Sequence, residues 1–188
     1  MRMVINNARI CFAKGLWNAE DYEGNGDFKF KVKILLDRNN KQMPDIRKIF
    51  QKMAAERWKD KGGAVLKSIE NNNQKFCLID GDNKTDVEGM EGMWIISTSS
   101  KVRPSVKNRD GVTDVAEADG VIYSGCYVNL HVEFRTMDHP KFGKGLFCTL
   151  RGAQFFRDGD AFSGAPKPAS DSEFADLSVE DDEVDVAF

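Results

Sequence analysis

The sequence contains few of the side chains on which most active sites depend. Among 188 residues there are two histidines and four cysteines, and the cysteines form no CxxC pair. A structural zinc site normally needs closely spaced pairs of such ligands, so we expect neither a metal nor another cofactor. Each cysteine lies in an apolar, strand-like stretch, which favours buried free thiols in a reducing cytoplasm.

Long apolar runs are also missing. The first residues, MRMVINNARICFAKG, lack the apolar segment of a secretory signal. No uncharged apolar run approaches the ~18 residues of a membrane span. We therefore expect a cytoplasmic protein that makes no use of a membrane.

Basic residues are absent from the end of the chain. Residues 170–188 hold eight acidic side chains and no basic one, whereas residues 1–169 hold 27 Lys and Arg against 22 Asp and Glu. A basic body suggests a polyanionic partner, and an acidic tail suggests a competitor for that partner. The segment GAPKPASDSEFADLSVEDDEVDVAF cannot bury enough apolar surface to offset the entropy cost of ordering it, so we predict one domain over residues 1–163 and a flexible acidic tail over 164–188.

Alternating apolar and polar residues predict strands in most of the body. In FKFKVKILL, residues 28–36, the apolar face carries Phe28, Phe30, Val32 and Ile34. In VIYSGCYVNLHVEF, residues 121–134, it carries Ile122, Cys126, Val128, Leu130, Val132 and Phe134. Further strands are predicted in MVINNARICFA, QKFCLID, GMWIISTSSKV and GLFCTLRGAQFF, where Leu146, Cys148 and Leu150 should point inward.

One helix interrupts the strands. In PDIRKIFQKMAAERWKDKGG, Pro44 stands near the start and Gly62–Gly63 after the end, which predicts a helix over about residues 44–61. Its apolar residues recur at helical spacing and form one buried face. Many strands, a single helix and no alternation of strands with helices predict a mainly β fold, a small β-barrel.

One acidic loop is the candidate for a metal or catalytic site. DGDNKTDVEGME, residues 80–91, resembles a calcium loop, but Lys84 stands at a ligand position and Thr85 replaces the required glycine. The same loop is the densest acidic cluster of the body and is the alternative site of a metal-dependent nuclease. Neither His131 nor His139 has a recognisable nucleophile or metal partner, so we expect no enzyme.

The polar faces of the strands instead suit binding of single-stranded nucleic acid. Such binding needs cations for the phosphates and aromatic rings for the bases. Lys29, Lys31 and Lys33 recur about 6.8 Å apart on ideal strand geometry. Stacking and charge on the other strands are predicted from Tyr123, Tyr127, Phe147 and Arg151. A basic segment follows Trp94 and carries Lys101 and Arg103.

Four motifs in one order resemble the single-stranded DNA-binding proteins of tailed bacteriophages. They are GMWIISTSSKVRPSV, VIYSGCYVNLHVEF and KGLFCTLRGAQFF, followed by RDGDAFSG. The resemblance implies an oligonucleotide/oligosaccharide-binding (OB) barrel without enzymatic activity. The implied role is to coat DNA during phage replication, recombination and repair in the cytoplasm of an infected bacterium. Carried over to this chain, the DNA surface includes Trp94, Lys101, Arg103, Tyr123 and Tyr127.

The acidic tail ends on an aromatic ring, in the sequence EDDEVDVAF. We expect the charges to compete with DNA for the basic body. The resemblance implies recruitment of replication proteins, such as a polymerase or a helicase–primase, and a possible homodimer. The predicted partner-binding residues are Glu180, Asp181, Asp182, Glu183, Asp185 and Phe188. A third hypothesis makes the tail the functional part and the barrel a passive scaffold.

Overall fold

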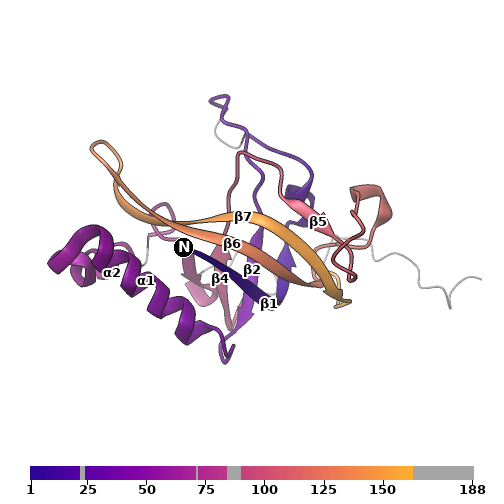
Figure 1. Cartoon of the computed structure of the whole chain (residues 1–188), viewed down its shortest axis with the longest axis horizontal. Coiled ribbons are helices and arrows are strands. Elements are labelled where there is room, and N and C mark those ends of the chain that lie inside the picture. The colour runs from indigo at the N-terminus through magenta and orange to yellow at the C-terminus, as the bar shows by residue number, and fades with distance from the viewer. Residues whose placement is uncertain (22–23, 71, 84–89, 163–188) are drawn as a thin grey trace, which may run out of the picture.

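The chain folds into a curved β-sheet that closes into a barrel. The computed structural model describes residues 1–21, 24–70, 72–83 and 90–162. The strands are β1 (Arg2–Cys11), β2 (Lys33–Asp37), β3 (Leu78–Asp80), β4 (Met93–Ser97), β5 (Ser105–Lys107), β6 (Tyr127–His139) and β7 (Gly143–Arg157). Their order in the sheet is β3-β4-β2-β1-β6-β7-β5. Parallel bridges from Thr98 to Cys148 and from Phe76 to Leu146 join the two sides, which confirms the predicted barrel (Figure 1).

The barrel interior is formed by the residues that the alternation predicted. On β6, Val128, Leu130, Val132 and Phe134 are buried, and on β7 so are Leu146, Cys148 and Leu150. The apolar side chains therefore face the interior, and their removal from water stabilises the fold. All four cysteines are buried and unpaired, as predicted.

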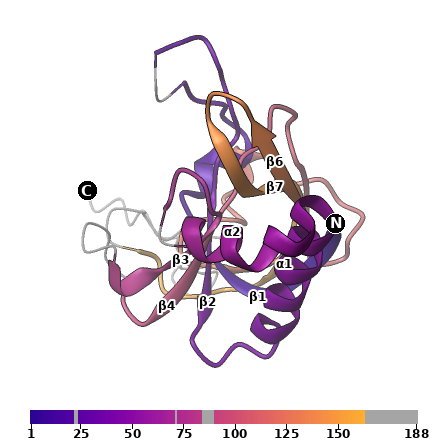
Figure 2. The same ribbon diagram turned by 90° about the vertical axis from the view of Figure 1, so that its left-hand side faces the viewer.

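Helices cover one end of the barrel (Figure 2). Helix α1 (Met43–Trp58) buries Phe50, whose ring meets Phe76 and Phe134 edge-on at centroid distances of 5.5 and 4.9 Å. The predicted helix is present, but Gly62–Gly63 do not end the helical region. A 3₁₀ turn (Lys59–Lys61) leads into α2 (Gly62–Ile69). A Cβ on Gly62 would lie 2.7 Å from the Ala54 carbonyl oxygen, so this glycine permits close contact between the two helices.

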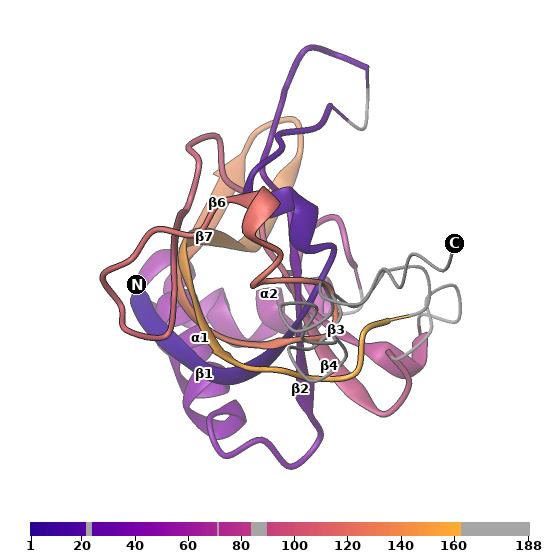
Figure 3. The same cartoon turned by 90° about the vertical axis from the view of Figure 1, so that its right-hand side faces the viewer.

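The strand predicted over residues 28–36 is shorter than expected. Strand β2 begins at Lys33, and before it only Lys29 and Phe30 form isolated bridges, with Glu20 and Ser100. Residues 24–32, here called the arm, rise beyond the barrel (Figure 3). Val32 and Ile34 point inward as predicted, but Phe28 is 61% exposed, because the arm extends past the end of the core.

A second, smaller cluster covers the outside of β2 and β4. It consists of Cys11, Leu35, Met90 and Ile95, with Phe162 packed against them. The stretch 61–92 therefore has defined roles where it is described. It supplies α2, strand β3, and a cover for the outer face. None of the helices in the described ranges is long and apolar enough to cross a membrane.

Candidate nucleic-acid interface

The outward side chains of β6 and β7 form one continuous polar surface, here called the β6–β7 face. The register pairs Asn129 with Gln154, Glu133 with Thr149, and Arg135 with Phe147. Arg151 is an extra residue at a bulge between His131 and Val132, so its side chain leaves the barrel. On the other side of β7, the parallel strand β5 adds Ser105 and Lys107. Alternation thus places polar and aromatic groups together on the side opposite the core.

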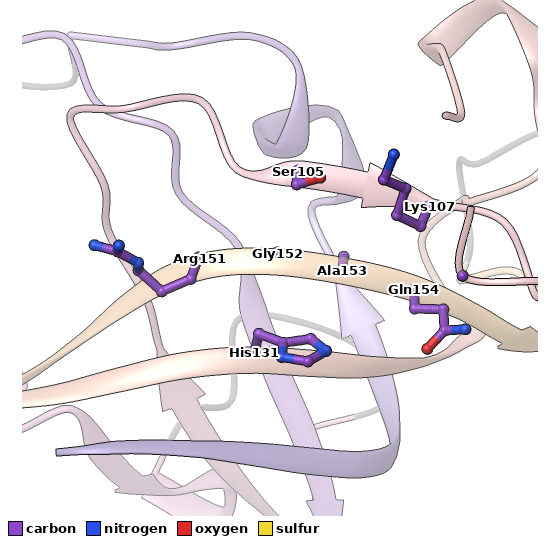
Figure 4. A pocket seen from close by; sticks show the side chains of 8 residues that line it. Ser105, Lys107, His131, Arg151, Gly152, Ala153 and Gln154 are labelled. Carbon is purple, nitrogen blue, oxygen red and sulfur yellow. The ribbon is translucent and has the colours of Figure 1, made fainter. Parts of the chain in front are cut away.

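This face is hollowed near its centre (Figure 4). The central recess has a volume of about 340 Å³ and is lined by Ser105, Lys107, Gly111, His131, Arg151, Gly152, Ala153 and Gln154. A neighbouring recess of about 250 Å³ is lined by Arg2, Met3, Val4, His131, Val132 and Arg151. Because His131 and Arg151 line both, the two recesses are adjacent, and together they are here called the groove, which extends over β1, β6, β7 and β5.

Arginine dominates the electrostatics of the groove. Two guanidiniums share one carboxylate, since Glu133 lies 3.6 Å from Arg2 and 3.4 Å from Arg151. The guanidinium of Arg135 lies 5.9 Å from the centroid of the Phe147 ring. Lys107 is neutralised locally, because its Nζ lies 2.7 Å from Asp114 and donates to the Val112 carbonyl at 3.0 Å. The arginines therefore outnumber the acid at the centre of the groove.

The predicted lysines are grouped at the arm rather than in a row along a strand. Asp27 binds Lys29 at 2.5 Å and Lys101 at 2.8 Å, and this joins the arm to the segment after β4. Hydrogen bonds from Lys101 and then Lys29 lower the pKa of Asp27 to about 2. Lys33 lies over the Phe12 ring, with Nζ 5.1 Å from its centroid. Lys31 is half-buried, and its carbonyl oxygen lies against Gly15.

The two predicted tyrosines take part in contacts at the end of β7. The Tyr123 hydroxyl lies 2.8 Å from the Gly159 carbonyl oxygen and 3.0 Å from an Asp158 carboxylate oxygen. Burial raises the pKa of Tyr123. The ring of Tyr127 is outside the barrel, with the Arg157 guanidinium 3.4 Å from its centroid. Tyr123 therefore anchors the chain, and Tyr127 is covered by a cation.

Trp94 does not lie with the basic residues that follow it in the sequence. It pairs with Leu36 across the sheet and packs against the main core. The guanidiniums of Arg38 and Arg47 lie 4.5 and 4.7 Å from its ring centroid. Lys101 and Arg103 are beyond the opposite end of β4. Side chains along β4 alternate between the two sides of the sheet, and Trp94 is at a position that faces inward.

Arg103 is exposed and precedes β5. It lines a separate recess of about 330 Å³ with Pro104, Ser105, Val106, Asp114, Val115, Ala116 and Asp119. Of the ten predicted DNA-binding residues, Tyr127, Phe147 and Arg151 therefore lie on the β6–β7 face, and Arg103 lies beside it.

Several residues of the β6–β7 face and of its groove were not assigned to DNA binding from the sequence. Arg135 continues the outward series of Tyr127, Asn129 and His131, so extending the alternation four residues past His131 would have found it. Lys107 belongs to the basic segment that follows Trp94, whereas Ser105 and Arg2 had no such signal. Their place depends on strand pairing with β7 and β6, which connects distant parts of the chain.

The loop proposed as a nuclease site is engaged in ion pairs where it is described. Arg38 donates to both oxygens of Asp80 and, at 2.5 Å, to Asp82. The hydrogen bonding from Arg38 to Asp80 lowers the pKa of the Asp80 carboxyl. Within residues 1–21, 24–70, 72–83 and 90–162, no group of three or more His, Cys, Asp or Glu side chains is arranged to hold a metal ion. Residues 84–89 lie outside the described part, as do the tail residues Glu180, Asp181, Asp182, Glu183, Asp185 and Phe188.

Comparison with known proteins identifies the family. The family model of the Enterobacter phage Enc34 ssDNA-binding protein matches residues 1–184. The chain belongs to the Enc34 ssDNA-binding protein family. A protein designated p50, from Acyrthosiphon pisum secondary endosymbiont phage 1, is 39% identical over 185 residues, which is 97% of each chain. The resemblance to phage single-stranded DNA-binding proteins is thereby confirmed.

Solved structures of phage single-stranded DNA-binding proteins have a similar fold. The Enc34 protein in complex with ssDNA matches with a TM-score of 0.64 at 22% identity, covering 86% of this chain and 89% of that one. The single-stranded DNA-binding protein gp2.5 of bacteriophage T7 matches with a TM-score of 0.54 at 11% identity, covering 87% and 95%. These similarities confirm the predicted OB-type barrel.

Proposed function

We propose that this chain binds single-stranded DNA without sequence preference and that the DNA lies along the groove of the β6–β7 face. Membership of the Enc34 family over residues 1–184 is the observation that carries the proposal. The β6–β7 face supports it, because its side chains have the two properties that sequence-tolerant binding needs: cations such as Arg151 for the backbone, and the rings of Phe147 and Tyr127 for the bases.

The phosphates are assigned to the arginines. Arg151 and Arg2 line the groove, and within the described ranges the one acidic side chain paired with them is Glu133, so a phosphate oxygen can take a place beside them. A guanidinium can bind such oxygens with two parallel hydrogen bonds. Lys29, Lys31, Lys33, Lys101 and Arg103 add positive charge at the arm and beside β5, where a longer strand would pass.

The bases are assigned to the rings that stand outside the barrel. Phe147 is half-buried on β7, and its ring lies over Gly145, where a Cβ would come within 2.5 Å of it. A base would stack on the ring face turned away from Gly145. The Tyr127 ring would become available for stacking if Arg157 moved from it to a phosphate. Trp94 and Tyr123 have other contacts and are placed outside the groove.

The test is a fluorescence titration with labelled oligo-dT at several salt concentrations. A bound strand should show a log–log slope of about −0.7 for each phosphate neutralised. Arg135→Ala should weaken binding, whereas Lys52→Ala on α1, a cation that lies 4.0 Å from Glu56 and away from the β6–β7 face, should not. An affinity for oligo-dT that does not change with salt, or an equal loss of affinity in both variants, would contradict the proposal.

The cellular role proposed for this binding is the coating of single-stranded DNA in phage replication and recombination, in the cytoplasm of the infected host. The eight charges of the tail would compete with DNA for the groove, and release of the tail by DNA would make it available to replication proteins. Self-association as a homodimer belongs to the same proposal. Removal of residues 170–188 should leave DNA binding intact or strengthen it, and loss of binding would contradict this part.

Catalysis is not part of the proposed function. The Enc34 family is one of DNA-binding proteins, and Arg38 already binds Asp80 and Asp82 in the loop considered for a nuclease. Labelled DNA incubated with Mg²⁺ or Mn²⁺ should remain intact. Divalent-dependent cleavage that disappears in Asp82→Ala would instead establish an enzyme.

A further inference from the structure

We propose that the central recess is a subsite for one unstacked nucleobase, held against the His131 imidazole. This inference rests on the proposed DNA binding and specifies which part of the ligand enters which part of the groove. Figure 4 shows the arrangement, with His131 on one side of Gly152, Ser105 on the other, and Arg151 and Lys107 toward the two ends. The volume of about 340 Å³ is within the ~300–1,000 Å³ typical of ligand pockets.

The floor of the recess is open because it has no large side chain. Gly152 stands between His131 on β6 and Ser105 on β5, and both of these residues pair with it. A Cβ on Gly152 would lie 3.1 Å from the Ser105 carbonyl oxygen, so any larger side chain would fill the space between the strands. On the β7 side, therefore, no side chain stands directly beside the imidazole at this register.

A planar aromatic ring suits this space. His131 is exposed on the outer face of β6, and its other cross-strand neighbour is Val4 of β1. An imidazole can stack on the face of a base, and every base has such a face. A base lying over Gly152 would thus contact His131 through its π-surface, which requires no particular sequence.

The polar groups of the recess suit the edge of a base without selecting one. Gln154 donates from Nε2 to the Arg109 carbonyl oxygen at 3.0 Å, which orients the amide and leaves Oε1 as an acceptor. Ser105 carries a hydroxyl that can donate or accept. Gly111, with φ of +74°, allows the 108–113 turn to approach Gln154 and close this end of the recess.

The flanking charges place the backbone on the Arg151 side. Lys107 is paired with Asp114, whereas Arg151 and Arg2 share Glu133. The phosphate next to the inserted base would therefore lie at the junction of the two recesses, beside Arg151. The neighbouring recess over Val4 would receive the adjacent nucleotide.

The experiment compares two oligomers of the same length and charge. One is oligo-dT of about 16 nucleotides, the upper end of an OB barrel's footprint, and the other has an abasic tetrahydrofuran residue at every position. Fluorescence anisotropy measures the affinity of wild type, His131→Ala and Gly152→Val for each oligomer. Lys52→Ala serves as a control away from the groove, and thermal melting checks that each variant is folded.

Both recess variants should weaken oligo-dT binding by about five- to tenfold, the lower range of base stacking, and should change abasic binding by less than about twofold. Equal losses on the two oligomers, or no loss on oligo-dT from His131→Ala, would overturn the subsite. Salt-sensitive oligo-dT binding that both variants retain would overturn the subsite and leave the proposed function intact. Failure of wild type to bind either oligomer would overturn both.

Discussion

Glu133 should limit the affinity of the groove for DNA, so its neutralisation should strengthen binding. The carboxylate lies within 4 Å of both Arg2 and Arg151 and competes with phosphate for them. Glu133→Gln keeps the length and shape of the side chain and removes the charge. We expect this substitution to increase affinity for oligo-dT, whereas Arg151→Ala should decrease it.

The size of the effect follows from the geometry. Arg151 lies 3.4 Å from Glu133, so a phosphate on the other side of the guanidinium would be about 6 Å from the carboxylate. In water, two unit charges at that separation interact with roughly 0.7 kcal/mol, about threefold in affinity. The side chains of Arg151 and Glu133 are 51% and 33% exposed, so solvent screening applies. Glu133→Gln should thus tighten binding about threefold at low salt.

The assay is anisotropy of labelled oligo-dT from about 50 to 200 mM salt. Arg151→Ala should reduce the steepness of the log–log slope by about 0.7, the contribution of one phosphate. Glu56→Gln on α1 is the matched control, because it also removes an acid near a cation but lies away from the groove. Weaker binding by Glu133→Gln, or an equal gain in Glu56→Gln, would refute the assignment of phosphate to this arginine pair.

Three further predictions concern the arm, the core and the tail. The folded-state pKa of Asp27 is lowered to about 2, so its ion pairs stabilise the protein above pH 4 and are lost as the pH falls toward 2. Asp27→Asn should therefore lower the thermal midpoint at pH 6, with the difference from wild type vanishing near pH 2. Phe50→Ala should cost about 3–5 kcal/mol in urea unfolding, because the ring is buried between Phe76 and Phe134. Phe188→Ala should leave oligo-dT affinity unchanged and impair pull-down of replication proteins; a fall in DNA affinity would assign the ring to the DNA site instead.

The local sequence pattern was sufficient to predict features that depend on a single strand or segment. The alternation in residues 121–134 and 146–150 identified the interior side chains, since a strand's two faces differ only in residue parity. The same parity correctly put Tyr127, Phe147 and Arg151 outside the barrel. Parity was less successful for Phe28, because the alternating pattern there continues past the end of the core. It also failed for Trp94, because the short motif did not reveal which side of β4 faces the core.

By itself, the sequence determined the family, the barrel class, the buried thiols and the division into a basic body and an acidic tail. Each depends on composition or on neighbouring residues. The groove was decided by tertiary structure. Ser105 meets Gly152 through a parallel pairing of β5 with β7, and Arg2 meets Arg151 through the carboxylate of Glu133 on β6. A bulge at Arg151 changes the parity of β7 midway. Contacts between segments far apart in the chain, and a single inserted residue, leave no periodic signal in the sequence.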